Sequence, residues 1–142
     1  MKQVFLLSVA FVTLMISSCA RKFEPIDYGK DGCAHCKMTI VEKQFAAEIV
    51  NEKGRVFKFD DISCMKAFTA ENHLDDSKIL SFVANYANPE QAFLDVNTAY
   101  MLFSESFKSP MNGYIAAFKS TDEAAEFQKK TGAVPADWTS IK

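Results

Sequence analysis

The chain has 142 residues, with 16 basic and 18 acidic side chains and a formal net charge of −2. A chain of this length can form one domain with a modest core, but it is too short for two domains with a core each. Because no basic stripe interrupts the balanced charge, nucleic acid is not an expected partner. Thirteen phenylalanines supply material for a core.

The first 18 residues have the pattern of a secretion signal. A start with one lysine is followed by an apolar run over residues 4–16, which is shorter than the ~20 residues that span a bilayer as a helix. Residues 16–19 then read Ile-Ser-Ser-Cys, the pattern that a lipoprotein signal peptidase accepts. We therefore expect Cys19 to carry lipid and to hold the chain on a membrane. An ordinary signal peptide or a single anchor helix is the alternative.

Ala20 follows the cysteine where an aspartate would favour the inner membrane. This favours the outer membrane, on its periplasmic face, although the inner membrane stays open. Residues 19–32 are polar and interrupted by Pro25, Gly29 and Gly32, so we expect a lipidated tether. One domain is expected over residues 33–142.

In the first part of that domain, the sequence predicts a hairpin followed by a helix. Two β-type runs, 44–50 and 55–59, are separated by a connection that ends in glycine. Asp60 and Asp61 then offer an N-cap for a short helix over residues 62–70.

The second part predicts further strands and a second helix. Strands are expected at residues 78–84, within 92–103, and at 114–118. Ser120 and Glu123 form a capping box for a helix that continues over residues 124–130 and ends at Gly132.

The two parts resemble each other. Phe59 and Phe118 each end a strand and precede a cap, and each is followed nine positions later by Phe68 or Phe127. Any capped helix after a strand could give this spacing, so duplication is one of two explanations. In either case we expect an α+β domain of two ββα-type halves, with short antiparallel strands and helices packed on one side.

Cysteine usage carries the functional signal. With Cys19 set aside, Cys33, Cys36 and Cys64 remain. An odd number of thiols in an exported protein means that at least one stays free, pairs between chains or binds something.

Soft donors concentrate in residues 33–38, which contain two thiols, a thioether and an imidazole. On an extended segment Cys36 and Met38 would face the same side. Thiolate and thioether favour Cu(I), and methionine is not a usual zinc ligand. Met111, in the tight turn 109–113, is a second candidate thioether. His35 is a weaker candidate, since it is expected in an exposed loop.

Other interpretations of these residues stay open. Cys64 either faces the core or points at the Cys33–Cys36 loop, where it could complete a zinc site with His35 or an aspartate. The Cys-x-x-Cys spacing could also form a disulfide in an oxidising compartment or a thiol–disulfide redox motif. Residues 38–41 are expected as a strand, however, and a redox motif would open a helix. Met65 and Met101 are expected in the core.

Taken in order, these motifs resemble the NosL family of copper-binding lipoproteins that assist maturation of nitrous oxide reductase. The resemblance covers nearly the whole chain and rests on Cys33-Ala34-His35-Cys36-Lys37-Met38-Thr39-Ile40, Phe45-Ala46-Ala47-Glu48, Gly54, Phe59-Asp60-Asp61-Ile62-Ser63-Cys64-Met65, Ser109-Pro110-Met111 and Ala116-Ala117-Phe118.

The resemblance implies a monomeric, membrane-tethered Cu(I) carrier and not an enzyme. It would deliver copper to the copper–sulfide centre of nitrous oxide reductase together with an ABC-type membrane assembly. The family's Cys-x-Met motif maps onto Cys36 and Met38, and its later methionine onto Met111. Lys37 and Asn112 stand where many members have glycine. Cys33 and Cys64 leave the ligand count open.

Overall fold

The computed structural model describes residues 21–141. The predicted signal sequence and the predicted lipidation site, Cys19, lie outside the described residues. Within that range no helix is both long and apolar enough to cross a membrane.

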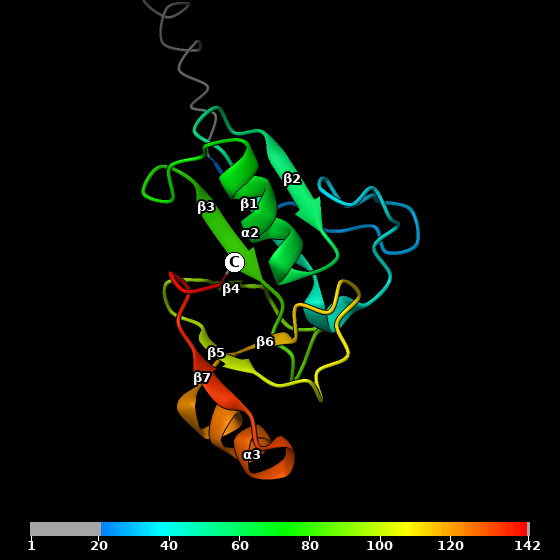
Figure 1. Cartoon of the computed structure of the whole chain (residues 1–142). Coiled ribbons are helices and arrows are strands. Elements are labelled where there is room, and N and C mark those ends of the chain that lie inside the picture. Colours follow the sequence, from blue (N-terminus) through cyan, green and yellow to red (C-terminus); the bar gives the residue numbers. More distant parts are fainter. Residues whose placement is uncertain (1–20, 142) are drawn as a thin grey trace, which may run out of the picture.

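The first half of the molecule is an antiparallel four-stranded sheet with one helix (Figure 1). The strands lie in the order β2-β1-β3-β4. The elements are β1 (Ala47–Val50), β2 (Val56–Phe59), α2 (Ile62–Glu71), β3 (Leu80–Val83) and β4 (Leu94–Asp95), preceded by a 3-10 turn, η2 (Lys43–Phe45). Phe68 of α2 packs its ring against Phe57 and Phe59 at 4.9 and 5.3 Å between centroids. The helix therefore covers the face of the sheet to which Phe57 and Phe59 point.

The second half repeats this arrangement with three strands in the order β6-β5-β7. Its elements are β5 (Tyr100–Phe103), β6 (Ile115–Phe118), α3 (Thr121–Thr131) and β7 (Val134–Ala136). In both halves the first strand lies between the second and third, and the strand-ending phenylalanine pairs with the start of the first strand: Ala47 with Phe59, and Tyr100 with Phe118. The expected α+β class is confirmed, and the two halves share a ββαβ topology.

Two cores hold these elements together. The larger core lies between the halves and includes Met65 and Met101, as expected. The smaller core joins α3 to its sheet, where Phe118 and Phe127 lie 5.0 Å apart. Both cores stabilise the fold by removing apolar surface from water.

Residues 21–31, which we call the N-terminal strap, lie against the first sheet. They fall within the segment expected to be a tether. Phe23 packs on Phe82 of β3, and Ile26 is buried. Because Phe57 and Phe59 of β2 face α2, the alternating side chain of Lys58, which bonds to the strap, faces the opposite side. The strap and α2 thus cover opposite faces.

Both helices match expectation, including the caps Asp61 and Ser120 and the αL residue Gly132. The strands are shorter than expected. β7 was not predicted because it has three residues, one of them Pro135, and exposes Val134. The strand expected at 38–41 is wrong: one isolated bridge joins Gly32 and Thr39 there.

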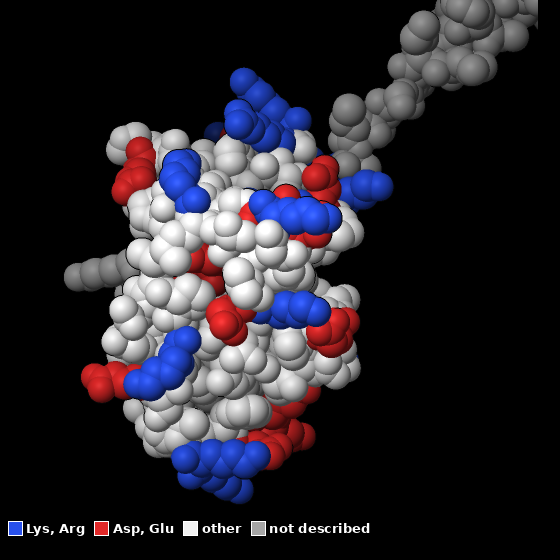
Figure 2. Space-filling model, turned by 90° about the vertical axis from the view of Figure 1, so that its right-hand side faces the viewer, with Lys and Arg blue, Asp and Glu red and all other residues white. Residues whose placement is uncertain are grey.

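Charged side chains are interspersed on the face drawn in Figure 2. Several charged side chains of the first half are paired, such as Lys43 with Glu90 and Lys58 with Asp31. That face presents no single basic surface.

Candidate metal centre

A tight turn presents the first two cysteines. The Cys33 amide donates to the Met38 carbonyl (2.8 Å), and the Lys37 amide donates back to Cys33 (3.1 Å). Lys37 has a φ of 68°, so the chain reverses and Cys36 and Met38 do not lie on one extended segment as expected. The Ala34 amide donates to the carbonyl of Lys58 in β2 (2.8 Å), which fixes this turn beside the end of that strand.

The other donors come from the junction of β2 and α2. Asp61 caps the helix by accepting the Ser63 amide (2.8 Å). Asp60, one residue earlier, is therefore left free to face the cysteine turn. Cys64 lies in the first turn of α2, where side chains tilt toward the helix N-terminus and thus toward Asp60.

These two segments bring four donors together: Cys33, Cys36, Asp60 and Cys64. Their ligand atoms all lie within 4.8 Å of one another. Cys36 Sγ donates to Asp60 Oδ2 at 3.3 Å, while Asp60 Oδ1 is buried without a hydrogen-bond partner. We call this group the thiol cluster. A buried carboxylate oxygen without a partner is costly, and a cation bound among these donors would satisfy it.

The protonation of the thiols follows from their burial. Desolvation raises the pKa of Cys36 to about 11, and the hydrogen bonds with Cys33 and Asp60 add to that shift while one with the Met38 amide opposes it. Desolvation, with the neighbouring Cys33 and Asp60, also raises the pKa of Cys64 well above its ordinary value. These two cysteines are therefore neutral at pH 7 when no metal is bound, and a metal must displace their protons.

The two candidate methionines lie at the surface. Met38 is 52% exposed and Met111 is 41% exposed. The Met111 amide donates to Asp61 Oδ2 at 3.0 Å. A Cβ on Gly113 would come within 2.7 Å of Asp61 and Ser63, so the 109–113 turn is seated on the start of α2.

The structure thus brings three of the five expected ligands, Cys33, Cys36 and Cys64, into one cluster, and it places the turn of Met111 on the helix start next to Asp60. His35 lies apart from the cluster, with Nδ1 3.2 Å from a Glu71 carboxylate oxygen. From the sequence, Asp60 is a candidate ligand only in the zinc interpretation, where Asp60 or Asp61 would complete a site with Cys64. The sequence signal for this ligand is the pair of adjacent aspartates. Since one of them caps the helix, the other remains available to bind a metal.

Three sulfurs and one oxygen form a soft donor set that suits Cu(I) better than a hard cation. The cysteines are free within the described residues. Cys36 is only partly buried, whereas Cys33 and Cys64 are buried. The arrangement offers a closed inner side and one side through which ligands can be exchanged.

The sequence profile of the NosL family matches residues 26–142. The chain belongs to the NosL family. No curated protein sequence matches it.

A solved structure similar to this NosL-family chain is the crystal structure of the copper chaperone NosL from Shewanella denitrificans, with a TM-score of 0.71 and 17% sequence identity. The match covers 87% of this chain and 97% of the other. At that identity the likeness establishes the shared fold.

Proposed function

We propose that this NosL-family chain is a Cu(I) carrier whose cargo binds at the thiol cluster and the two exposed methionines. The observation that carries this proposal is the convergence of Cys33, Cys36, Cys64 and Asp60 within 4.8 Å. The family and the structural likeness to a copper chaperone support it.

The geometry suits transfer. Met38 and Met111 are exposed thioethers, and they can take up copper from solvent without losing a proton. Cys36 connects the surface to the buried donors, and its thiol proton leaves for water as its sulfur binds the cargo. Release reverses these steps, because a recipient's ligands can enter on the open side before those of the carrier leave.

We also propose where in the cell the protein acts and which proteins it works with. Lipid on Cys19 would hold the protein on a bacterial membrane, with the outer membrane facing the periplasm preferred. The recipient would be nitrous oxide reductase, working with an ABC-type maturation complex. The genes beside this one would test the recipient: a nitrous oxide reductase gene supports it, and a different copper enzyme redirects it.

An anaerobic Cu(I) titration against a chromophoric chelator tests copper binding. The chain from Ala20 onward is compared with Cys36→Ser, Met38→Leu and Met111→Leu. Met101→Leu is the matched control, since Met101 is buried in the core. We expect near-stoichiometric binding that the first three changes weaken and the control leaves unchanged. Absence of competitive binding by the reduced protein would contradict the proposal.

A zinc-stabilised structural domain is the second candidate, because three thiols and a carboxylate are also zinc ligands. It predicts that a chelator unfolds the protein and that Met111→Leu has no effect. A thiol–disulfide protein, the third candidate, likewise gives Met111 no role. The copper titration of Met111→Leu therefore separates the carrier from both.

A further inference from the structure

The N-terminal strap crosses the first sheet from one edge to the other. Phe23 packs against Phe93, next to β4, and Phe82 of β3 at 4.6 and 5.9 Å. The Glu24 amide then donates to Glu48 Oε1 in β1 (2.9 Å). Lys58 of β2 holds the far end of the strap. These contacts follow the strand order β4, β3, β1, β2.

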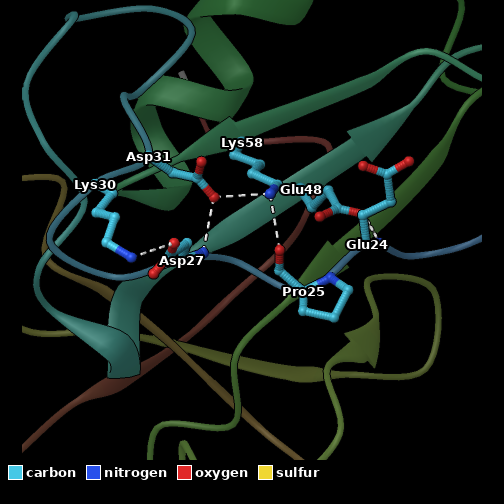
Figure 3. A network of polar contacts seen from close by, with 7 residues as sticks. All are labelled: Glu24, Pro25, Asp27, Lys30, Asp31, Glu48 and Lys58. Atoms are coloured by element: carbon cyan, nitrogen blue, oxygen red, sulfur yellow. Dashed lines mark hydrogen bonds and ion pairs between the residues drawn. The ribbon is translucent and has the colours of Figure 1, made fainter.

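Lys58 fastens the strap twice (Figure 3). Its Nζ donates to the carbonyl of Pro25 (2.8 Å) and to Asp31 Oδ2 (2.7 Å). Its own carbonyl accepts the Ala34 amide of the cysteine turn. One residue of β2 therefore holds both the strap and the turn that carries Cys33 and Cys36.

The end of the strap also pairs with the segment that follows the cysteines. The Gly29 amide donates to the Ile40 carbonyl, and the Ile40 amide donates to the Asp31 carbonyl, each at 2.9 Å. The bridge between Gly32 and Thr39 continues this pairing. Loosening the strap would therefore loosen residues 33–38 as well.

Glu48 lies beneath the strap and is 0% exposed. It accepts the Glu24 amide through Oε1, but Oε2 is buried and has no hydrogen-bond partner. Desolvation raises its pKa, the Glu24 amide and the Lys58 charge lower it, and the carboxylates of Glu24 and Asp31 raise it. Its neighbour in β3, Phe82, carries no charge.

Desolvation is the largest of these effects and raises the pKa of Glu48 to about 7. A charged carboxylate would be costly in this dry position, and only opening of the strap would hydrate it.

We propose that Glu48 is a proton-operated latch: its neutral carboxyl keeps the strap closed on the sheet, and loss of the proton to water opens the strap and loosens the cysteine turn against Asp60 and Cys64. The effect on copper exchange rests on the proposed function. The motion of the strap does not.

The direction and size follow from linkage. Burial raises the pKa of Glu48 from 4.5 to about 7, and opening of the strap would return it toward 4.5, so the stability of the closed state is fully present below pH 4.5 and is lost as the pH rises through 7. Between pH 6 and pH 8 the equilibrium constant for opening rises about tenfold, and it levels off above that range.

Hydrogen exchange of the metal-free full chain in detergent micelles at pH 6 and pH 8 tests this. After correction for the intrinsic exchange rate, the protection of the Gly29 and Ile40 amides should fall about tenfold in the wild type. Glu48→Gln should abolish that fall. Glu52→Gln, at an exposed glutamate in the β1–β2 turn, is the matched control and should behave as wild type.

Equal protection at both pH values, or the same fall in Glu48→Gln, would overturn the latch. A second measurement needs no variant: the carboxyl 13C signal of Glu48 and the ring signals of Phe23 should titrate together near pH 7. Independent titration of the two would also overturn it. Because copper is absent from both experiments, their failure leaves the copper proposal standing, and failure of copper binding leaves the latch standing.

Discussion

The two halves of the molecule share a ββαβ topology but use the junction between second strand and helix differently. In the first half Asp61 caps the helix, which leaves Asp60 facing three thiols. In the second half Lys119 occupies the position of Asp60, and its amide donates to Glu123 Oε2 at 3.2 Å while Ser120 caps the helix. The same junction is therefore open to a ligand in one half and closed on itself in the other.

The comparison also shows what the second half contributes. It has no cysteine, yet its 109–113 turn reaches across to Asp61. The first half supplies the thiols, and the second half supplies one thioether and a close contact that fixes the start of α2. The candidate metal centre thus draws on both halves.

The largest expected effect is on the affinity for copper, which should depend on the junction of the first half and not on that of the second. Cys64→Ser removes a thiolate, and we expect the affinity for Cu(I) to fall by about 100-fold, which corresponds to about 3 kcal/mol. Glu123→Gln, at the matching position of the second half, should leave it unchanged. Equal losses in both, measured by chelator competition, would remove the distinction between the halves.

Cap removal should also affect the halves unequally. Asp61→Ala deletes bonds to the amides of Ser63 and Met111 and to the Ser63 hydroxyl, so we expect about 2–4 kcal/mol of lost stability. Ser120→Ala deletes one bond and should cost about 1 kcal/mol. Urea unfolding measures both, and a larger loss for Ser120→Ala would contradict this account.

The contact between the halves can be tested at a glycine. Gly113→Ala places a Cβ 2.7 Å from Asp61 and Ser63, and such overpacking costs about 1–3 kcal/mol. Gly32→Ala has open space around it and should change stability by less than about 0.5 kcal/mol. Thermal unfolding compares the two variants. Equal stabilities would show that the 109–113 turn is not seated as described.

A last effect concerns the reactivity of Cys36 in the metal-free protein. With the pKa of Cys36 raised from 9.0 to about 11, its thiolate fraction at pH 8 is ~100-fold lower than in the unfolded chain. Iodoacetamide should therefore alkylate it slowly in the folded protein and faster as the pH rises. Mass spectrometry of samples alkylated at several pH values measures this rate. A rate that is higher in the folded than in the unfolded protein would contradict the prediction.

Local signals made the helices predictable. The Ser120 box, the Asp61 cap and Gly132 act within a few residues, so sequence alone locates α2 and α3 closely. The convergence of Cys33, Cys36 and Cys64 could only be suspected, because it depends on the long-range bond from Ala34 to β2.

Other features carried no readable signal. The left-handed conformation of Lys37 occurs in a residue that does not favour it, so the segment was predicted as extended. The strap is polar in composition, and only its few apolar residues, Phe23 and Ile26 among them, make it pack. Glu48 lies in a strand whose sequence predicts one buried face and one face exposed to solvent. Its burial could not be predicted, because it follows from the strap that covers the second face.

We propose that copper binds at the first junction, between the cysteine turn and the start of α2. NMR chemical-shift mapping of the 15N-labelled protein during anaerobic Cu(I) titration tests it most directly. We expect amide shifts confined to residues 33–38, 60–64 and 109–113, and none over Thr121–Thr131 of α3. Shifts centred on α3, or no shifts at one equivalent of copper, would contradict the account.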